Sequence, residues 1–447
     1  MTLTSLVKYI LPTIVMMVLF SCYTIIDGMF ISKFIWSNAL SATNIVFPVI
    51  SLILGVGIMF AIGCSAIVAK KMGEGKNKEE KEDFTLITIS ALVVGCIIAV
   101  ISIAFMKEII YVLGSTEALY DNCKEYLFYM VIFTPFVVLK LYFDYFLVTA
   151  GVPNLGLISG IVGGLINIVL DYVFIVELNL GVKVAAFATC IGYIVPSFVG
   201  IIYFMNKKHA LHFVKPKFNF KVIKDSCTNG SSDMVTQLAS AITTFIFNIV
   251  MIKYLGEDGV AAITITLYLQ MLLNAAYIGF TSGVQPRISY NYGSENEEQL
   301  EKLIKYSILI ISVFGVSTFI MCRAMADVLI SLFSDRGTEL FSITRNGLML
   351  FSTSFLVGGI NIFSSGMFTA FSNGKVSALL SLLRTFVFFA LGIMILPKFM
   401  GVNGVWLVIP FVEVITLLVS IAFIYKYRKE YMYENLFIRR RTLDINS

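Results

Sequence analysis

Residues Gly163–Phe174, with the sequence GGLINIVLDYVF, place two polar side chains inside a hydrophobic run that is long enough to cross a membrane. Asn167 and Asp171 are four residues apart, so a helix puts them on one face. A carboxylate at membrane depth costs at least ~2.5 kcal/mol, even on the lenient insertion scale. We therefore interpret this face as the binding site of a coupling ion, with the helices of a transporter arranged around it.

The composition indicates a polytopic membrane protein. Of the 447 residues, 58% are hydrophobic and 14% are charged, whereas a soluble domain carries roughly 25% charged residues. At roughly 20 apolar residues per crossing, the chain has room for about twelve helices joined by short loops. The net charge of +5 comes from basic residues scattered through these loops, a pattern that argues against a nucleic-acid partner.

The apolar segments predict an all-α protein of twelve transmembrane helices in two six-helix bundles. They lie near 9–34, 43–69, 85–106, 125–148, 155–176, 184–205, 226–251, 262–285, 304–322, 344–368, 376–397 and 403–426. We expect a charged loop at 70–83 after the second segment. The predicted domains are an N-terminal lobe at 1–205, a cytoplasmic linker at 206–224, a C-terminal lobe at 225–427 and a basic cytoplasmic tail at 428–447.

Cysteine and histidine give no sign of a metal centre or a disulfide framework. The seven cysteines show no paired spacing, and most lie in apolar runs, where cysteine behaves as a small hydrophobic residue. His209 and His212 lie in a basic loop and are expected to be solvated. The first apolar run is too long for a cleavable signal, so we expect a retained helix. No cofactor is expected beyond a coupling ion.

The distribution of Lys and Arg predicts the orientation in the membrane. With the N-terminus in the cytoplasm, the even-numbered loops and both termini collect 22 of the 33 basic residues, and the odd-numbered loops collect 8. Because cytoplasmic loops carry the excess of basic residues, we expect both termini inside, in the plasma membrane.

An internal repeat relates the two halves. A shift of 220 residues superimposes landmarks that span about 160 residues, including Gly63 on Gly283, Gly73 on Gly293 and Thr149–Ala150 on Thr369–Ala370. Because each half has an even number of helices, both halves enter from the same side. The sequence therefore predicts a parallel repeat, with two lobes and a cavity between them.

The intramembrane polar residues do not follow the repeat. The same shift replaces Asp27, Asn167, Asp171 and Thr189 with apolar residues. At 1.5 Å per residue, Asp27 and Asp171 both lie roughly 25 Å from the cytoplasmic side, and Thr189 is at a compatible level. Two carboxylates, an amide and a hydroxyl suit Na⁺, and two close carboxylates could instead share a proton. The structural alternative is that Asn167 caps Asp171 and holds helices together.

Other charged residues fall inside the predicted helices. Lys140 and Asp144 are four residues apart near the cytoplasmic end of a helix, and we expect a local salt bridge with the lysine snorkelling toward the membrane surface. Asp233 and Arg384 lie near the cytoplasmic side of the second lobe, where they could pair as an inner gate or as a structural bridge. Glu413 lies deeper without an evident partner. It could be a second protonatable or cation-contacting carboxylate, or a contact for the substrate.

Several stretches together resemble the multidrug and toxic compound extrusion (MATE) family of cation antiporters. The resemblance covers essentially the whole chain. It is carried by Asp27–Ser32 (DGMFIS), Gly63–Ala66 (GCSA) with Gly73, Asn167–Asp171 (NIVLD), Gly279–Gly293 (GFTSGVQPRISYNYG), Leu396–Trp406 (LPKFMGVNGVW) and Pro410–Glu413 (PFVE). Pro12 stands fifteen residues before Asp27, as in family members whose first helix bends at that proline.

The resemblance implies export of amphipathic, often cationic drugs, driven by inward movement of Na⁺ or H⁺ through a V-shaped pair of bundles. The cation site of the family's N-terminal lobe maps onto Asp27, Asn167, Asp171 and Thr189. A branch with an acidic residue in mid-helix 7 has Gln237 or Leu238 in that neighbourhood here. The chain is therefore similar to the branch that couples through the N-terminal lobe. Expected partners are small-molecule drugs, organic cations and the lipid bilayer, with a monomeric protein.

Three alternative functions make different demands on the sequence. A flippase for lipid-linked precursors, from the related superfamily, should line its cavity with several cations, but only Arg384 and Lys140 lie deep in the helices. A membrane enzyme needs a catalytic cluster, and no predicted helix contains a histidine. A channel has no need of an asymmetric carboxylate site.

Overall fold

The structure is a computed structural model that describes residues 2–34, 37–178, 182–331 and 333–436, apart from the side chains of residues 27–41, 182 and 183. These described residues form helices and no strand. In the first half, the helices are α1 (Leu3–Phe34), α2 (Ser37–Gly73), α3 (Asn77–Ala104), α4 (Met106–Val112), α5 (Glu117–Ile132), α6 (Thr134–Thr149), α7 (Pro153–Asp171), the π-helical turn η1 (Tyr172–Glu177) and α8 (Val182–Met205).

The second half begins with a very long helix. Its elements are α9 (Phe220–Gly293), α10 (Glu297–Ala324), α11 (Ala326–Ser331), α12 (Glu339–Phe351), the 3₁₀ turn η2 (Ser352–Ser354), α13 (Phe355–Ala370), α14 (Gly374–Leu382), the π-helical turn η3 (Leu383–Val387), α15 (Phe388–Met400), α16 (Val402–Trp406), α17 (Val408–Tyr427) and the 3₁₀ turn η4 (Glu434–Leu436).

Twelve membrane crossings account for these helices. Within the described ranges, ten helices are long and apolar enough to span a bilayer, and the bent pair α5–α6 makes an eleventh. The 74-residue α9 contains Gly256 at φ 64°, ψ −149°, a backbone conformation that a side chain disfavours, so α9 is two spans joined at this glycine. The predicted all-α, twelve-helix fold is confirmed.

Two local predictions were wrong. The segment predicted as one helix at 125–148 is broken into α5 and α6, which are bent by 53°. Pro135, in the first turn of α6, has no N–H to continue the ladder of α5. The expected loop at 70–83 is mostly helical, because Lys71 pairs with Glu79 at 2.9 Å and with Asp83 at 2.7 Å, which holds α2 and α3 together across a short turn.

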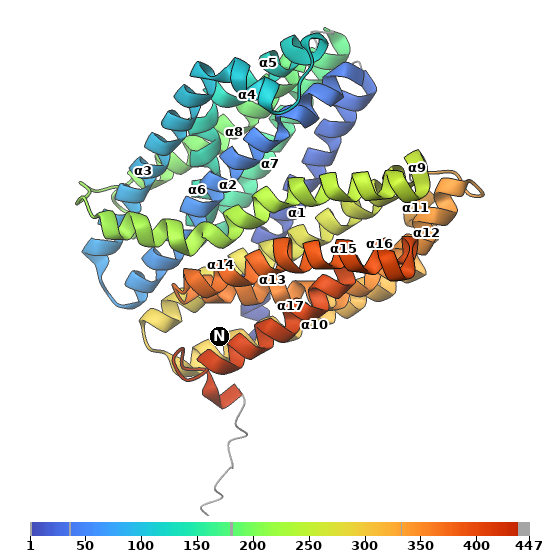
Figure 1. Cartoon of the computed structure of the whole chain (residues 1–447). Coiled ribbons are helices and arrows are strands. Elements are labelled where there is room, and N and C mark those ends of the chain that lie inside the picture. The colour runs from blue at the N-terminus through green and yellow to red at the C-terminus, as the bar shows by residue number, and fades with distance from the viewer. Residues whose placement is uncertain (1, 35–36, 179–181, 332, 437–447) are drawn as a thin grey trace, which may run out of the picture.

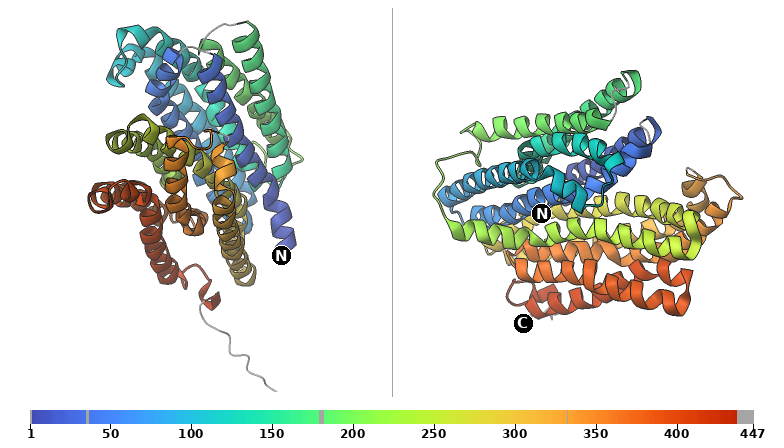
Figure 2. Two further views of the ribbon diagram at one scale, coloured as in Figure 1. Left: turned by 90° about the vertical axis from the view of Figure 1, so that its right-hand side faces the viewer. Right: turned by 45° about the horizontal axis from the view of Figure 1, so that its top comes forward.

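The two halves form separate bundles. In Figure 1, α9 runs between the α1–α8 bundle and the remaining helices of the second half, and the bundles diverge toward the right of the view. The right-hand view of Figure 2 shows the same division as two stacked layers, blue to green and yellow to red. The main contacts between the halves join α1 and α2 to α9. We call the bundles the N-lobe and the C-lobe.

Glycines bring α2 and α9 together at one end of the molecule. A Cβ atom added at Gly73 would lie 2.0 Å from the Tyr290 carbonyl oxygen, and one added at Gly293 would lie 2.1 Å from the Lys70 carbonyl oxygen. Each residue in one contact is 220 positions from its counterpart in the other, so the two contacts are related by the internal repeat. This end also holds the connections 74–76, 206–219 and 294–296, and we call it the linker end.

A second reciprocal pair lies further along the same interface. An added Cβ at Gly63 would lie 1.9 Å from the Ser226 carbonyl oxygen, and one at Gly230 would lie 1.9 Å from the Met59 carbonyl oxygen. We call Gly63, Gly73, Gly230 and Gly293 the glycine seam. The lobes are therefore packed backbone against backbone at the linker end.

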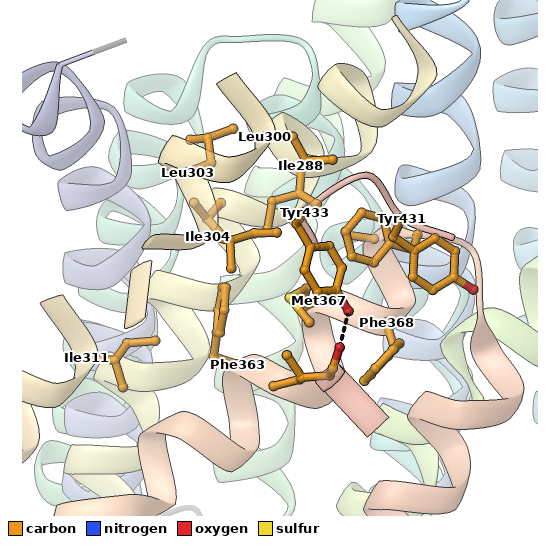
Figure 3. Close-up of a cluster of buried hydrophobic side chains, with 14 of the residues drawn as sticks. Ile288, Leu300, Leu303, Ile304, Ile311, Phe363, Met367, Phe368, Tyr431 and Tyr433 are labelled. Atoms are coloured by element: carbon orange, nitrogen blue, oxygen red, sulfur yellow. Dashed lines mark hydrogen bonds between the residues drawn. The ribbon is translucent and has the colours of Figure 1, made fainter. Parts of the chain in front are cut away.

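The segment after α17 belongs to the C-lobe core, although it was expected to be part of a tail. Figure 3 shows Tyr431 and Tyr433 beside Met367 and Phe368, with the Tyr433 hydroxyl donating to the Ile424 carbonyl oxygen at 2.9 Å. The Tyr433 side chain is fully buried. Tyr431 and Tyr433 thus pack on the C-lobe, where their aromatic rings complete an apolar cluster.

The outer surface is apolar, as a lipid-facing surface must be. On α10, Leu309, Val313, Val316 and Ile320 recur at helical spacing and are between 47% and 58% exposed. A stripe of large aliphatic side chains this long has no stable place in water. The fold is that of a multi-pass membrane protein.

Candidate functional site

A cavity of about 150 Å³ lies inside the N-lobe between α1, α7 and α8, with Lys140 reaching it from α6. Small and apolar residues form most of its wall, including Gly160, Gly163 and Gly164 of α7. Polar groups enter it at few points, which are Tyr23, Lys140, Asn167, Thr189 and Tyr193. Such a concave, largely apolar site with a few convergent polar groups is typical of a small-ligand site.

Asn167 connects the polar groups on α7 to those on α8. Its Nδ2 donates to Asp171 Oδ2 at 3.1 Å and to Thr189 Oγ1 at 3.4 Å. Thr189 Oγ1 donates in turn to the Ala185 carbonyl oxygen at 3.0 Å. Asn167 is 1% exposed, Asp171 0% and Thr189 8%. The structure therefore brings three of the four predicted site residues together inside the N-lobe.

Two glycines make this approach possible. A Cβ added at Gly163 would lie 2.4 Å from the Gly192 carbonyl oxygen, and one at Gly192 would lie 2.9 Å from the Gly163 carbonyl oxygen. Because α7 and α8 touch at these backbones, the next turn of each helix places Asn167 opposite Thr189. The π-helical turn η1 begins directly after Asp171, and such turns occur frequently at functional sites.

One oxygen of this cluster is left for a ligand. Asn167 Oδ1 is buried, and no hydrogen-bond partner for it exists among the described residues. Leaving a buried amide oxygen unsatisfied costs about 1–3 kcal/mol, which a bound cation or water would recover. The amide, carboxylate and hydroxyl oxygens around it are hard ligands, so the donor set fits Na⁺.

The fourth predicted residue cannot be placed. The side chain of Asp27 lies outside the described residues, so its approach to Asp171 stays a prediction. Ile26, the residue before it, lines the same cavity as Asn167. Helix α1 continues through Pro12 as a single helix from Leu3 to Phe34, and the hinge role of Pro12 also stays a prediction.

Lys140 and Asp144 form the expected salt bridge, at 2.7 Å. Their side chains are only 8% and 5% exposed, so the pair is buried and does not extend toward the membrane surface as expected for a snorkelling lysine. The Lys140 ammonium also lies 4.5 Å from the centre of the Phe20 ring and 5.6 Å from that of Tyr193. Nothing near Lys140 in the sequence indicates that it lines the cavity, because its neighbours there come from other helices.

The predicted contact between Asp233 and Arg384 was wrong. Arg384 Nη2 pairs with Glu413 Oε1 at 2.6 Å, and Arg384 Nε lies 3.0 and 3.2 Å from the two carboxylate oxygens. Asp233 instead accepts a hydrogen bond from the Ser232 hydroxyl at 3.0 Å. Glu413, expected to lack a partner, also accepts from Asn361 Nδ2 at 2.7 Å. Asn361 was missed, although an amide in the apolar stretch 355–363 was a visible signal.

Twelve crossings in two repeated lobes, with a buried polar cavity in one of them, form the architecture of a membrane transporter. The sequence model of the MatE family matches residues 12–173 and 234–394, two stretches of nearly equal length whose starts are 222 residues apart. The chain belongs to the MatE family. The two matched stretches agree with the internal repeat.

Relatives and solved structures match almost the whole chain. The multidrug export protein MepA of Staphylococcus saprophyticus is 24% identical over 406 residues, which is 90% of this chain and 87% of that protein. MepA of Staphylococcus haemolyticus is 25% identical over 403 residues, with 90% and 88% covered.

Two solved structures show the same fold. A multidrug resistance MATE family transporter in an outward-facing conformation gives a TM-score of 0.88 at 22% identity, covering 94% of each chain. A variant of the Vibrio cholerae MATE transporter VcmN gives 0.88 at 19% identity, covering 96% of this chain and 99% of that one.

Proposed function

We propose that the protein is a multidrug efflux transporter, which exports amphipathic or cationic compounds in exchange for inward movement of Na⁺ or H⁺. The observation that carries this proposal is the buried Asn167–Asp171–Thr189 cluster, which stands in one lobe only and leaves Asn167 Oδ1 for a ligand. The export activity named for the MepA relatives supports the substrate class.

The cluster acts as a switch because its occupation changes its charge. A cation or proton that enters the cavity compensates Asp171 and, as predicted, Asp27. Helix α1 borders the cavity through Tyr23 and Ile26, so compensation there alters how α1 packs on α7. Coupling requires that ion and drug prefer different states of the two lobes. Pro12, which frees a backbone carbonyl in α1, is the proposed hinge.

The proposed orientation in the membrane indicates which side of the protein is closed. With both termini in the cytoplasm, the linker end faces the cytoplasm, and the glycine seam closes that side. We propose that the structure is outward-facing, and that inward opening separates α2 from α9 along the seam.

The flippase alternative gains no support from the deep cationic residues. Lys140 is paired with Asp144 and Arg384 with Glu413, so both charges are already compensated. A phosphate would have to break a buried ion pair to use either of them.

The test uses Asp171→Asn in proteoliposomes that contain the purified protein. Uptake of a fluorescent organic cation is driven by a Na⁺ gradient at equal pH or by a pH gradient without Na⁺. We expect the wild type to respond to at least one gradient, and Asp171→Asn to respond to neither while it still binds the compound. Asp258→Asn, an exposed Asp on α9, is the matched control. Gradient-driven uptake at the wild-type rate in Asp171→Asn would refute the assignment.

A further inference from the structure

The C-lobe contains a buried charged cluster that ion coupling through the N-lobe leaves unexplained. Arg384 lies in the π-helical turn η3, Glu413 in α17 and Asn361 in α13. The side chains of Arg384 and Glu413 are 16% and 4% exposed, and Asn361 is 2% exposed. Burying an ion pair costs several kcal/mol per ion unless the geometry is good and the remaining oxygens are satisfied.

Both oxygens of Glu413 are satisfied. Oε1 accepts from Arg384 Nη2 at 2.6 Å and from Nε at 3.0 Å, while Oε2 accepts from Arg384 Nε at 3.2 Å and from Asn361 Nδ2 at 2.7 Å. Asn361 is held by a second bond from Nδ2 to the Glu413 carbonyl oxygen at 2.8 Å, and it accepts from the Ser420 hydroxyl at 3.3 Å. The guanidinium therefore meets the carboxylate with two of its nitrogens, within a network built from three helical segments.

The internal repeat relates this ion pair to residues of the N-lobe cavity. A shift of 220 or 221 residues places Arg384 on Gly164 or Gly163, and Glu413 on Tyr193 or Gly192. All four of these N-lobe residues line the cavity that contains Asn167 and Thr189. The arginine of one lobe thus stands where the other lobe leaves open space.

We propose that Arg384 is a tethered cation, which permanently occupies the C-lobe counterpart of the N-lobe cavity and keeps Glu413 from taking an exchangeable ion. The fold then has two related sites, one that exchanges its cation and one whose cation is part of the chain. Because this assigns ion coupling to a single lobe, it deepens and rests on the proposed function. Its consequence is that the Arg384–Glu413 cluster keeps a constant charge while the lobes move.

Removing the guanidinium should turn the C-lobe cluster into an exchangeable site. In Arg384→Met, the Glu413 carboxylate keeps Asn361 but loses its counter-ion. The Tyr277 phenol of α9 also faces Glu413, and it cannot supply a positive charge. Binding of Na⁺ or a proton would then compensate Glu413, and anything that binds the folded state alone stabilises it.

The experiment measures thermal unfolding of the full-length protein in detergent, with NaCl or choline chloride at about 150 mM and at about pH 6 and pH 8. Relative to the wild type, we expect the Tm of Arg384→Met to rise by several degrees with Na⁺ or at the lower pH. Arg384→Met with Glu413→Gln should lose this extra dependence, since it has no carboxylate to compensate. Arg384→Lys, which keeps the charge, should respond to both ions as the wild type does.

Three results would overturn the assignment. One is an Arg384→Met protein whose Tm depends on Na⁺ and pH no more than the wild type does. If that variant is not recovered in any of these solutions while the double variant is recovered in all, no exchangeable cation replaces the guanidinium, and the assignment also fails. The third is a folded double variant that has lost gradient-driven uptake, which would place coupling in the C-lobe. The unfolding measurement does not depend on transport. A failure of this proposal in that measurement can therefore be distinguished from a failure of the proposed function in the Asp171→Asn uptake test.

Discussion

Gly230→Ala should weaken the state of the protein in which the linker end is closed. The added Cβ would lie 1.9 Å from the Met59 carbonyl oxygen, whereas Cβ atoms essentially never approach another heavy atom within 3.0 Å. Helices α2 and α9 must therefore separate locally by about 1 Å. A gap of 0.5–1 Å forfeits roughly a quarter to a half of each dispersion contact along its edges.

The free-energy cost of this substitution can be taken from overpacked interiors of other proteins. Inserting a methyl group into a closely packed interface costs about 1–3 kcal/mol. The seam is packed only in the closed state, so this cost shifts the equilibrium toward the state in which the lobes separate at this end. A change of about 1–3 kcal/mol corresponds to roughly a 5- to 150-fold change in population.

The half-buried Cys227 of α9 provides the assay, because it packs against the core of the N-lobe at the linker end. Its maleimide labelling rate, followed by mass spectrometry of its peptide, should rise in Gly230→Ala by a factor within this range. Labelling of Cys322, buried in the C-lobe core, should not change and reports on global unfolding. Gly95→Ala is the matched control, since its new Cβ would meet Pro135 Cα at an ordinary 3.4 Å. Equal Cys227 labelling in both variants and the wild type would refute the reasoning.

Two further predictions concern the N-lobe cavity. Thr189→Val removes an oxygen and the acceptor of the 3.4 Å bond from Asn167, worth about 1 kcal/mol, so the coupling ion should be needed at roughly five-fold higher concentration in the uptake assay. An unchanged ion requirement would contradict a role for Thr189. Lys140→Met leaves Asp144 buried without its partner at 2.7 Å, which should cost about 3–5 kcal/mol and lower the Tm. Combining it with Asp144→Leu should recover most of that loss, and a double variant no more stable than Lys140→Met would show that the pair itself is not responsible.

Much of the candidate site could be predicted because it is local. Asn167 and Asp171 share a face wherever that stretch is helical, and their hydrogen bond at 3.1 Å follows from a spacing of four residues. Lys140 and Asp144 meet for the same reason. The pairing of Arg384 with Glu413 is different, since they are 29 residues apart and helices α15 and α16 lie between them in the chain.

The sequence by itself determined the helical class, the two repeated lobes and the lobe in which the polar residues gather. The fold class can be read from apolar run length and periodicity in the chain alone. A bilayer offers no hydrogen-bond partner to backbone N–H and C=O groups, so a long apolar segment that spans it must pair them internally as a helix. Only the tertiary structure decided that Thr189 lies opposite Asn167, that Lys140 borders their cavity and that Arg384 reaches Glu413. These contacts depend on how closely two helices approach and at what register. Glycines such as Gly163 and Gly192 permit that approach, but the sequence around each glycine does not identify which helix will pack against it.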